Sequence, residues 1–152
     1  MKSRTRTTST KSTRRAIVRR HAESLSAEGY VIESSDDYVC IETHIGAVVL
    51  RACDQPPLLG FTAVIDLDRA GTPEELLALL NQLNRESTGV RHFQDEDEPS
   101  SIRSEMDVHI HGDDVSGAAV AELLESFIFE CETAIETMLE SGLLVEDAED
   151  SP

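Results

Sequence analysis

The stretch GFTAVIDLDRAGTPEELLALLNQLNRES, residues 60–87, decides the fold class of this 152-residue chain. It opens with apolar side chains at every second position, which is the pattern of a strand that buries one face. The other face is mixed, since Val64 lies between polar Thr62 and Asp66. We therefore expect a strand in the centre of a sheet. Its buried face comprises Phe61, Ala63, Ile65 and Leu67.

The second part of the stretch predicts a helix that begins at a capping box. Thr72 supplies the N-cap hydroxyl, Pro73 occupies the first helical position, where no N–H is needed, and Glu75 follows three residues after the cap. A wide leucine stripe at helical spacing predicts that this helix packs on the sheet. We expect Gly89 to end it. The stripe comprises Leu76, Leu77, Leu79, Leu80 and Leu83.

Similar patterns on both sides of this stretch complete a small α+β domain. We expect residues 54–57 to break the ladder before the central strand, because proline has no N–H to donate. Residues 30–33 can add a short strand after the first helix. The expected order is helix, three strands, helix, two strands, helix (α-β-β-β-α-β-β-α), with the helices covering an antiparallel sheet. The further elements are a helix over 14–28, strands over 38–43, 47–53, 90–93 and 102–110, and a last helix over 117–141 capped by Ser116.

Charge divides the chain into a basic arm and an acidic body. Residues 1–20 contain eight Lys and Arg and no acid, so residues 21–152 carry a net charge of −25 against a total of −17. We expect a disordered basic arm over 1–13, one domain over 14–141 and a flexible acidic tail over 142–152. An acidic body repels nucleic-acid phosphates and favours basic or amphipathic partners.

The basic arm admits several roles. It is compatible with transient contact with nucleic acid or an anionic membrane, with docking onto the protein's own acidic body, with an organelle transit peptide, or with a simple solubilising tail.

Composition favours a soluble protein of the reducing cytoplasm. No apolar run is long enough to span a bilayer, and the N-terminus lacks the apolar core of a secretory signal. Cys40, Cys53 and Cys131 form no CxxC pair, so neither a disulfide framework nor a zinc site of that kind is indicated. We expect no cofactor and no membrane partner.

The face of the sheet turned away from the helices is too apolar for open water. We expect a second protomer or a client peptide to cover it, unless its apolar side chains are scattered surface residues of no consequence. Glu42, Arg51 and Asp66 form its expected rim. The candidate partner-binding residues are Tyr38, Cys40, Ala47, Val49, Thr62 and Val64.

The end of the strand over 102–110 carries a pattern typical of a transition-metal site. Asp107, His109 and His111 alternate on one face, and a His-x-His pair at this spacing can bind such an ion. The sequence offers no clear fourth ligand, so polar residues on a solvated strand are the simpler interpretation. We therefore assign no metal ligand.

No catalytic motif occurs elsewhere in the sequence. The cysteines fall within patterns typical of buried apolar positions, and no Gly-rich phosphate loop, GxSxG or HExxH is present. The acidic run 94–98 lacks the glycine and distal Glu of an EF-hand, so we expect a solvated hairpin loop. Asn84, near a helix end, is expected to bind backbone groups there. The sequence predicts that the protein is not an enzyme.

Two motifs resemble those of the YbjN-like family of bacterial sensory transduction regulators. One is the run Leu83, Asn84 and Arg85 in the middle helix, and the other is the Gly112–Ser116 lead-in to the last helix. The resemblance covers about residues 15–139 and leaves the basic arm outside. It implies a fold similar to type III secretion chaperones and a non-catalytic, dimeric module, and it supplies no catalytic residues.

Together these features favour a dimeric, chaperone-like or adaptor protein that binds a protein partner in bacterial regulation or stress signalling. The apolar sheet face would provide affinity, and the acidic surface would select basic or amphipathic segments. The alternatives are a metal-dependent enzyme using the His-x-His strand and a nucleic-acid accessory acting through the basic arm.

Overall fold

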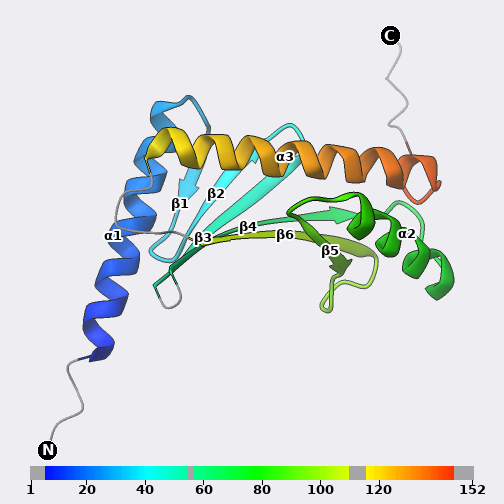
Figure 1. Ribbon diagram of the computed structural model, residues 1–152, viewed down its shortest axis with the longest axis horizontal. Helices are drawn as coiled ribbons and strands as arrows, with labels where there is room; N and C mark the ends of the chain where they lie inside the picture. Colours follow the sequence, from blue (N-terminus) through cyan, green and yellow to red (C-terminus); the bar gives the residue numbers. More distant parts are fainter. Residues whose placement is uncertain (1–5, 55–56, 110–115, 146–152) are drawn as a thin grey trace, which may run out of the picture.

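The computed structural model describes residues 6–54, 57–109 and 116–145; of residues 6–13, 54 and 57 it describes the backbone alone. This part of the chain has the order α-β-β-β-β-α-β-β-α (Figure 1). The α+β class is confirmed, and one strand is added, because the segment after the first helix pairs with its neighbour. The elements are α1 (Arg6–Ala27), β1 (Ile32–Ser34), β2 (Tyr38–Thr43), β3 (Gly46–Asp54), β4 (Pro57–Asp66), α2 (Pro73–Glu86), β5 (Arg91–Gln94), β6 (Ser101–His109) and α3 (Gly117–Glu140).

The described strands form one antiparallel sheet in the order β1-β2-β3-β4-β6-β5. β4 lies between β3 and β6, which confirms the central position predicted for it: Phe61 pairs with Leu50 on one side and with Met106 on the other. Pairing continues to Asp54 and Pro57, so the expected break in the ladder is wrong. Proline is tolerated there because it is the first residue of β4.

The three helices lie on one side of the sheet, and α3 runs across the strands (Figure 1). α3 contributes to two clusters of buried side chains. In the first, α1 and the N-terminal half of α3 pack on β2, β3 and β4, and the rings of Phe61 and Phe127 stack with centroids 5.8 Å apart. In the second, α2 and the C-terminal half of α3 bury Ile65, Leu79 and Met138. Among the described helices, none combines the length and apolar composition needed to cross a membrane.

The capping box predicted for α2 is formed. The Glu75 N–H donates to Thr72 Oγ1 over 3.2 Å, and the Thr72 N–H donates to Glu75 Oε2 over 2.8 Å. A hydrogen bond from Arg69, together with that from the Thr72 backbone, lowers the pKa of Glu75. The predicted role of Gly89 is wrong, because Ser87 is the C-cap and its extended backbone already leads the chain out of the helix.

Helical structure extends further towards the N-terminus than the sequence indicated. α1 begins at Arg6, whereas we expected disorder over residues 1–13 and a helix from residue 14. Residues 6–13 contain no Gly or Pro, and a residue added to an existing helix needs only propagation and no new nucleus. Residues 1–5 lie outside the described part of the chain.

The C-terminal boundary also differs. Gly142 follows the end of α3 with a positive φ of 74°, and this turn brings Leu143 back onto the second cluster. Leu143, expected in a flexible tail, is 1% exposed, and its C=O accepts hydrogen bonds from the N–H groups of Asp68 and Arg69. The domain therefore includes this residue, while residues 146–152 lie outside the described part.

α1 crosses α3 at the N-terminal end of α3. A Cβ atom at Gly117 would lie 2.6 Å from the Cβ of Ser24, closer than two side-chain carbons can approach. Glycine at this position therefore permits close contact between α1 and α3. This contact sets the position of α1 relative to α3.

His21 is a buried polar residue on α1 in the first cluster. Its side chain is 1% exposed, and within the described residues neither ring nitrogen has a hydrogen-bond partner. Burial, assisted by the charge of Arg20, lowers its pKa from 6.5 to about 4. The folded protein therefore contains this imidazole in its neutral form at pH 7.

Replacing His21 should make folding less sensitive to acid. His21 takes up a proton more readily in the unfolded chain than in the folded protein. The free energy of unfolding is therefore unaffected by protonation of this residue above pH 6.5 and falls by about 3 kcal/mol as the pH is lowered towards 4. His21→Leu should remove most of this decline and raise the free energy of unfolding at pH 7 by about 1–3 kcal/mol. Urea unfolding between pH 7 and 4 measures both, with exposed His109→Gln as the control. An unchanged pH slope in His21→Leu would contradict the assignment.

Candidate functional site

The face of the sheet opposite the helices, called the open face below, carries all six candidate partner-binding residues. The strand register places Cys40, Val49 and Thr62 side by side in a row across β2, β3 and β4. Tyr38 and Val64 are 42% and 46% exposed, so solvent reaches this face. Ala47, also exposed, lies next to Glu42 on the neighbouring strand. The residues thus share one face, and their role in binding stays a prediction.

Several charged side chains around the open face pair with one another. Arg103 binds Asp95 through contacts of 2.8 and 3.0 Å, and Arg91 binds Asp107 over 2.9 Å. A hydrogen bond from the Asp97 N–H, with the contribution of Arg103, lowers the pKa of Asp95. Asp95 is only 5% exposed, so the solvated loop expected here is wrong at this residue, which anchors the turn between β5 and β6.

A hollow of about 270 Å³ lies on the open face beside α1. Its floor includes Thr62, and Arg14 of α1 also lines it. Gly60 leaves the space free, because a Cβ there would lie 3.1 Å from a carboxylate oxygen of Asp107. Arg14, Leu58 and Gly60 are not among the residues predicted from the sequence, although continuing the period of two back from Thr62 selects the last two.

The His-x-His strand does not form a metal centre within the described residues. Asp107 and His109 lie on the open face, where Asp107 is already bound to Arg91, and His111 lies outside the described part of the chain. In the ranges that the structure describes, no group of three His, Cys, Asp or Glu side chains is placed to hold a metal ion.

A buried polar cluster underneath α3 contains a histidine, a serine and a cysteine. His92 Nδ1 lies 2.8 Å from Ser104 Oγ, while burial raises the pKa of the Cys131 thiol to about 12 despite a hydrogen bond with Ser104. Burial also lowers the pKa of His92. His92 is 3% exposed and the other two 0%, so a substrate has no access to them. The arrangement stabilises the core and lacks an exposed nucleophile.

Asn84 binds backbone groups, as the sequence predicted, but they are those of His92 in β5, the strand that follows α2. Its side-chain amide donates to the His92 carbonyl and its side-chain oxygen accepts from the His92 N–H, each over 2.8 Å. This pair of hydrogen bonds connects α2 to β5 and positions the buried polar cluster.

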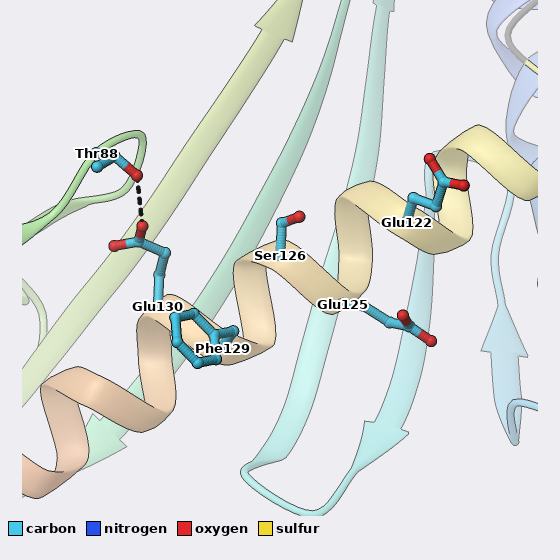
Figure 2. A pocket seen from close by; sticks show the side chains of 6 residues that line it. All are labelled: Thr88, Glu122, Glu125, Ser126, Phe129 and Glu130. Atoms are coloured by element: carbon cyan, nitrogen blue, oxygen red, sulfur yellow. Dashed lines mark hydrogen bonds between the residues drawn. The ribbon is translucent and has the colours of Figure 1, made fainter.

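A second surface lies on the solvent side of α3 (Figure 2). Phe129 is 67% exposed, next to a hollow of about 570 Å³. Phe129 is not among the residues predicted from the sequence, although it is an aromatic residue outside the apolar stripe of α3. We call this the Phe129 surface. It consists of Thr88, Glu122, Glu125, Ser126, Phe129 and Glu130.

Comparison with family models gives one match that covers most of the chain. Residues 15–140 match the YbjN family, described as "Putative bacterial sensory transduction regulator". Comparison with curated proteins gives no match.

Two solved structures share the fold. YbjN from E. coli, described as "a putative transcription regulator", has a TM-score of 0.62 and 16% identity, over 81% of this chain and 91% of that chain. The Yersinia pestis type III secretion chaperone SycH, solved in complex with a stable fragment of YscM2, has a TM-score of 0.53 and 18% identity, over 81% of this chain and 98% of that chain. At these identities the likeness is one of fold.

The Cys131 thiol should be unreactive in the folded protein. In a Cys40→Ser/Cys53→Ser variant, which retains Cys131 alone, a disulfide reagent at pH 8 should label no thiol in native buffer and one thiol per chain in denaturant. The wild-type protein, in which Cys40 is half-buried on the open face, provides the comparison. Rapid labelling of native Cys131 would contradict the burial of this cluster and reopen a catalytic role.

Proposed function

The chain belongs to the YbjN family, and from this premise we propose that it is a non-catalytic, dimeric adaptor or chaperone-like protein that binds another polypeptide through the open face. Its regulatory role in the bacterial cytoplasm would follow from which partner it holds.

The main support for this proposal is the exposed apolar centre of the open face. Tyr38 and Val64 remain accessible although they flank the half-buried row of Cys40, Val49 and Thr62. An exposed tyrosine beside aliphatic side chains is typical of the anchors that supply most of the affinity in protein interfaces. The hollow near Gly60 adds a place where a partner side chain can enter the surface.

Charge supports a basic or amphipathic segment as the occupant. Residues 21–152 carry a net charge of −25, which repels nucleic acid and attracts basic chains. On the β5–β6 side of the open face, Arg91 and Arg103 are already paired with Asp107 and Asp95, so the charges along this edge are neutralised. Such a rim sets orientation, and the apolar contacts supply most of the affinity.

The comparison with SycH supports a protein partner, since that chaperone of the same fold was solved with a polypeptide fragment bound. The burial of His92 and Cys131 supports the non-catalytic part of the proposal, because the chemically versatile side chains of this cluster lie inside the core.

Photo-crosslinking tests the open face directly. A photoreactive phenylalanine analogue placed at Val64 and activated in cells should yield a discrete adduct with another polypeptide. The same analogue at Leu77, an apolar residue 61% exposed on α2, is the matched control and should yield none. Adding Val49→Glu to the Val64 probe should reduce the adduct at least about tenfold, because it places a charge in the apolar row.

Mass spectrometry of the Val64 adduct decides between occupants. Peptides from a different protein support the proposal, while peptides from a second copy of this chain assign the open face to dimerisation and contradict it. Equal adducts at Val64 and Leu77 also contradict it. Thermal melts of each variant confirm that a lost adduct is not lost folding.

A further inference from the structure

Phe129 is an exposed aromatic side chain on the outer side of α3. Its exposed fraction is 67%, whereas Phe61 and Phe127 are fully buried. Figure 2 shows its ring on the outer side of the helix, next to Glu130. A large aromatic ring in water at the edge of a hollow is typical of a residue that becomes buried on association.

The surroundings of Phe129 are acidic. α3 contains six Glu and no Lys or Arg, and the positions from Glu122 to Glu140 extend over about 27 Å of helix. Burial acts to raise the pKa of Glu130. Hydrogen bonds, including the one that Thr88 Oγ1 donates over 2.6 Å, outweigh burial and lower the pKa, so Glu130 stays ionised. A basic segment that can also cover an aromatic ring is the complementary ligand.

The strongest complement to this surface lies in the chain itself. Residues 1–20 hold eight of the thirteen Lys and Arg of the protein and no acid. Six of the eight are arginines, whose guanidinium groups bind aromatic faces as well as carboxylates. Arg15 and Arg19 are paired with Asp36 and Glu23 of the same copy, so the basic residues that precede them in the chain are the complement to the Phe129 surface.

Geometry separates the basic half of α1 from the Phe129 surface of the same copy. α1 meets α3 where Ser24 contacts Gly117, and Phe129 lies twelve residues further along α3, about 18 Å away. From that contact α1 runs as one helix back to Arg6 and leads away from α3 (Figure 1). A basic N-terminal segment that covers the Phe129 surface would therefore have to come from another copy.

We propose that two copies of this chain associate by placing the basic N-terminal half of α1 of each copy on the Phe129 surface of the other. A two-fold axis makes the two contacts equivalent and closes the assembly as a dimer. This inference rests on the dimeric state in the proposed function. It leaves the strand residues of the open face available for the partner polypeptide.

Sedimentation equilibrium of the full chain tests the contact. At about 50 mM NaCl the wild-type protein should be dimeric, and about 500 mM NaCl should weaken association by screening the charges. Phe129→Ala should raise the dimer dissociation constant at least about tenfold. Leu77→Ala, which truncates a similarly exposed apolar residue on α2, is the matched control and should leave the constant unchanged.

A charge-swap experiment identifies the two surfaces as partners. Arg6→Glu/Lys11→Glu and Glu122→Lys/Glu125→Lys should each abolish homodimers at low salt. Mixing the two variants should restore a dimer, because the acidic arm of one then meets the basic α3 of the other. Thermal melts and circular dichroism confirm that each variant remains folded.

Four outcomes overturn the proposal. They are a wild-type monomer at low salt, a dimer that survives Phe129→Ala and both charge reversals, no recovery on mixing, and a salt-sensitive gel shift with duplex DNA that needs residues 1–13 while dimerisation does not. The last assigns the arm to nucleic acid. A wild-type monomer would also remove the dimeric state from the proposed function. None of the four outcomes affects the Val64 adduct with a different polypeptide, so failure of this inference is distinguishable from failure of partner binding.

Discussion

The packing of α3 across the sheet is the constraint on which the rest of the structure depends. Among the described helices, only α3 contributes to both clusters of buried side chains, and the stacked rings of Phe61 and Phe127 attach it to the central strand. α1 is placed by its contact with Gly117, and α2 packs on the C-terminal half of α3. Burial of one side of α3 therefore determines where both other helices lie.

The same packing creates the two surfaces to which we assign binding roles. All three helices lie on one side, so the apolar row of Cys40, Val49 and Thr62 has no helix to cover it. α3 itself has one buried and one solvent-facing side, and Phe129 lies on the latter. The apolar sheet face suits an amphipathic segment, whereas the acid-rimmed aromatic suits a basic one. Separate surfaces allow dimerisation and partner binding at the same time.

The sequence predicts those parts of the fold whose cause is local. The capping box at Thr72 and Glu75, the alternation in β4 and the glycine after α3 each depend on neighbouring residues, and all three are present. Burial of Asp95 depends on Arg103 across a turn, and burial of Leu143 depends on a cluster formed by distant elements, so neither has a local pattern. The six open-face residues and Gly60 could be selected by alternation alone. The position of Asp107 beside Gly60 required the strand register, and the exposure of Phe129 required knowing which side of α3 faces the sheet.

The central claim is that the face opposite the helices is open in the isolated chain and covered in the working protein. Hydroxyl-radical footprinting of side chains, performed on dilute purified protein and inside cells, measures this directly. The account predicts that Tyr38 and Val64 are oxidised readily in the purified protein and protected in cells, while Leu77 is oxidised equally in both. Equal oxidation of Tyr38 and Val64 in the two conditions would contradict it.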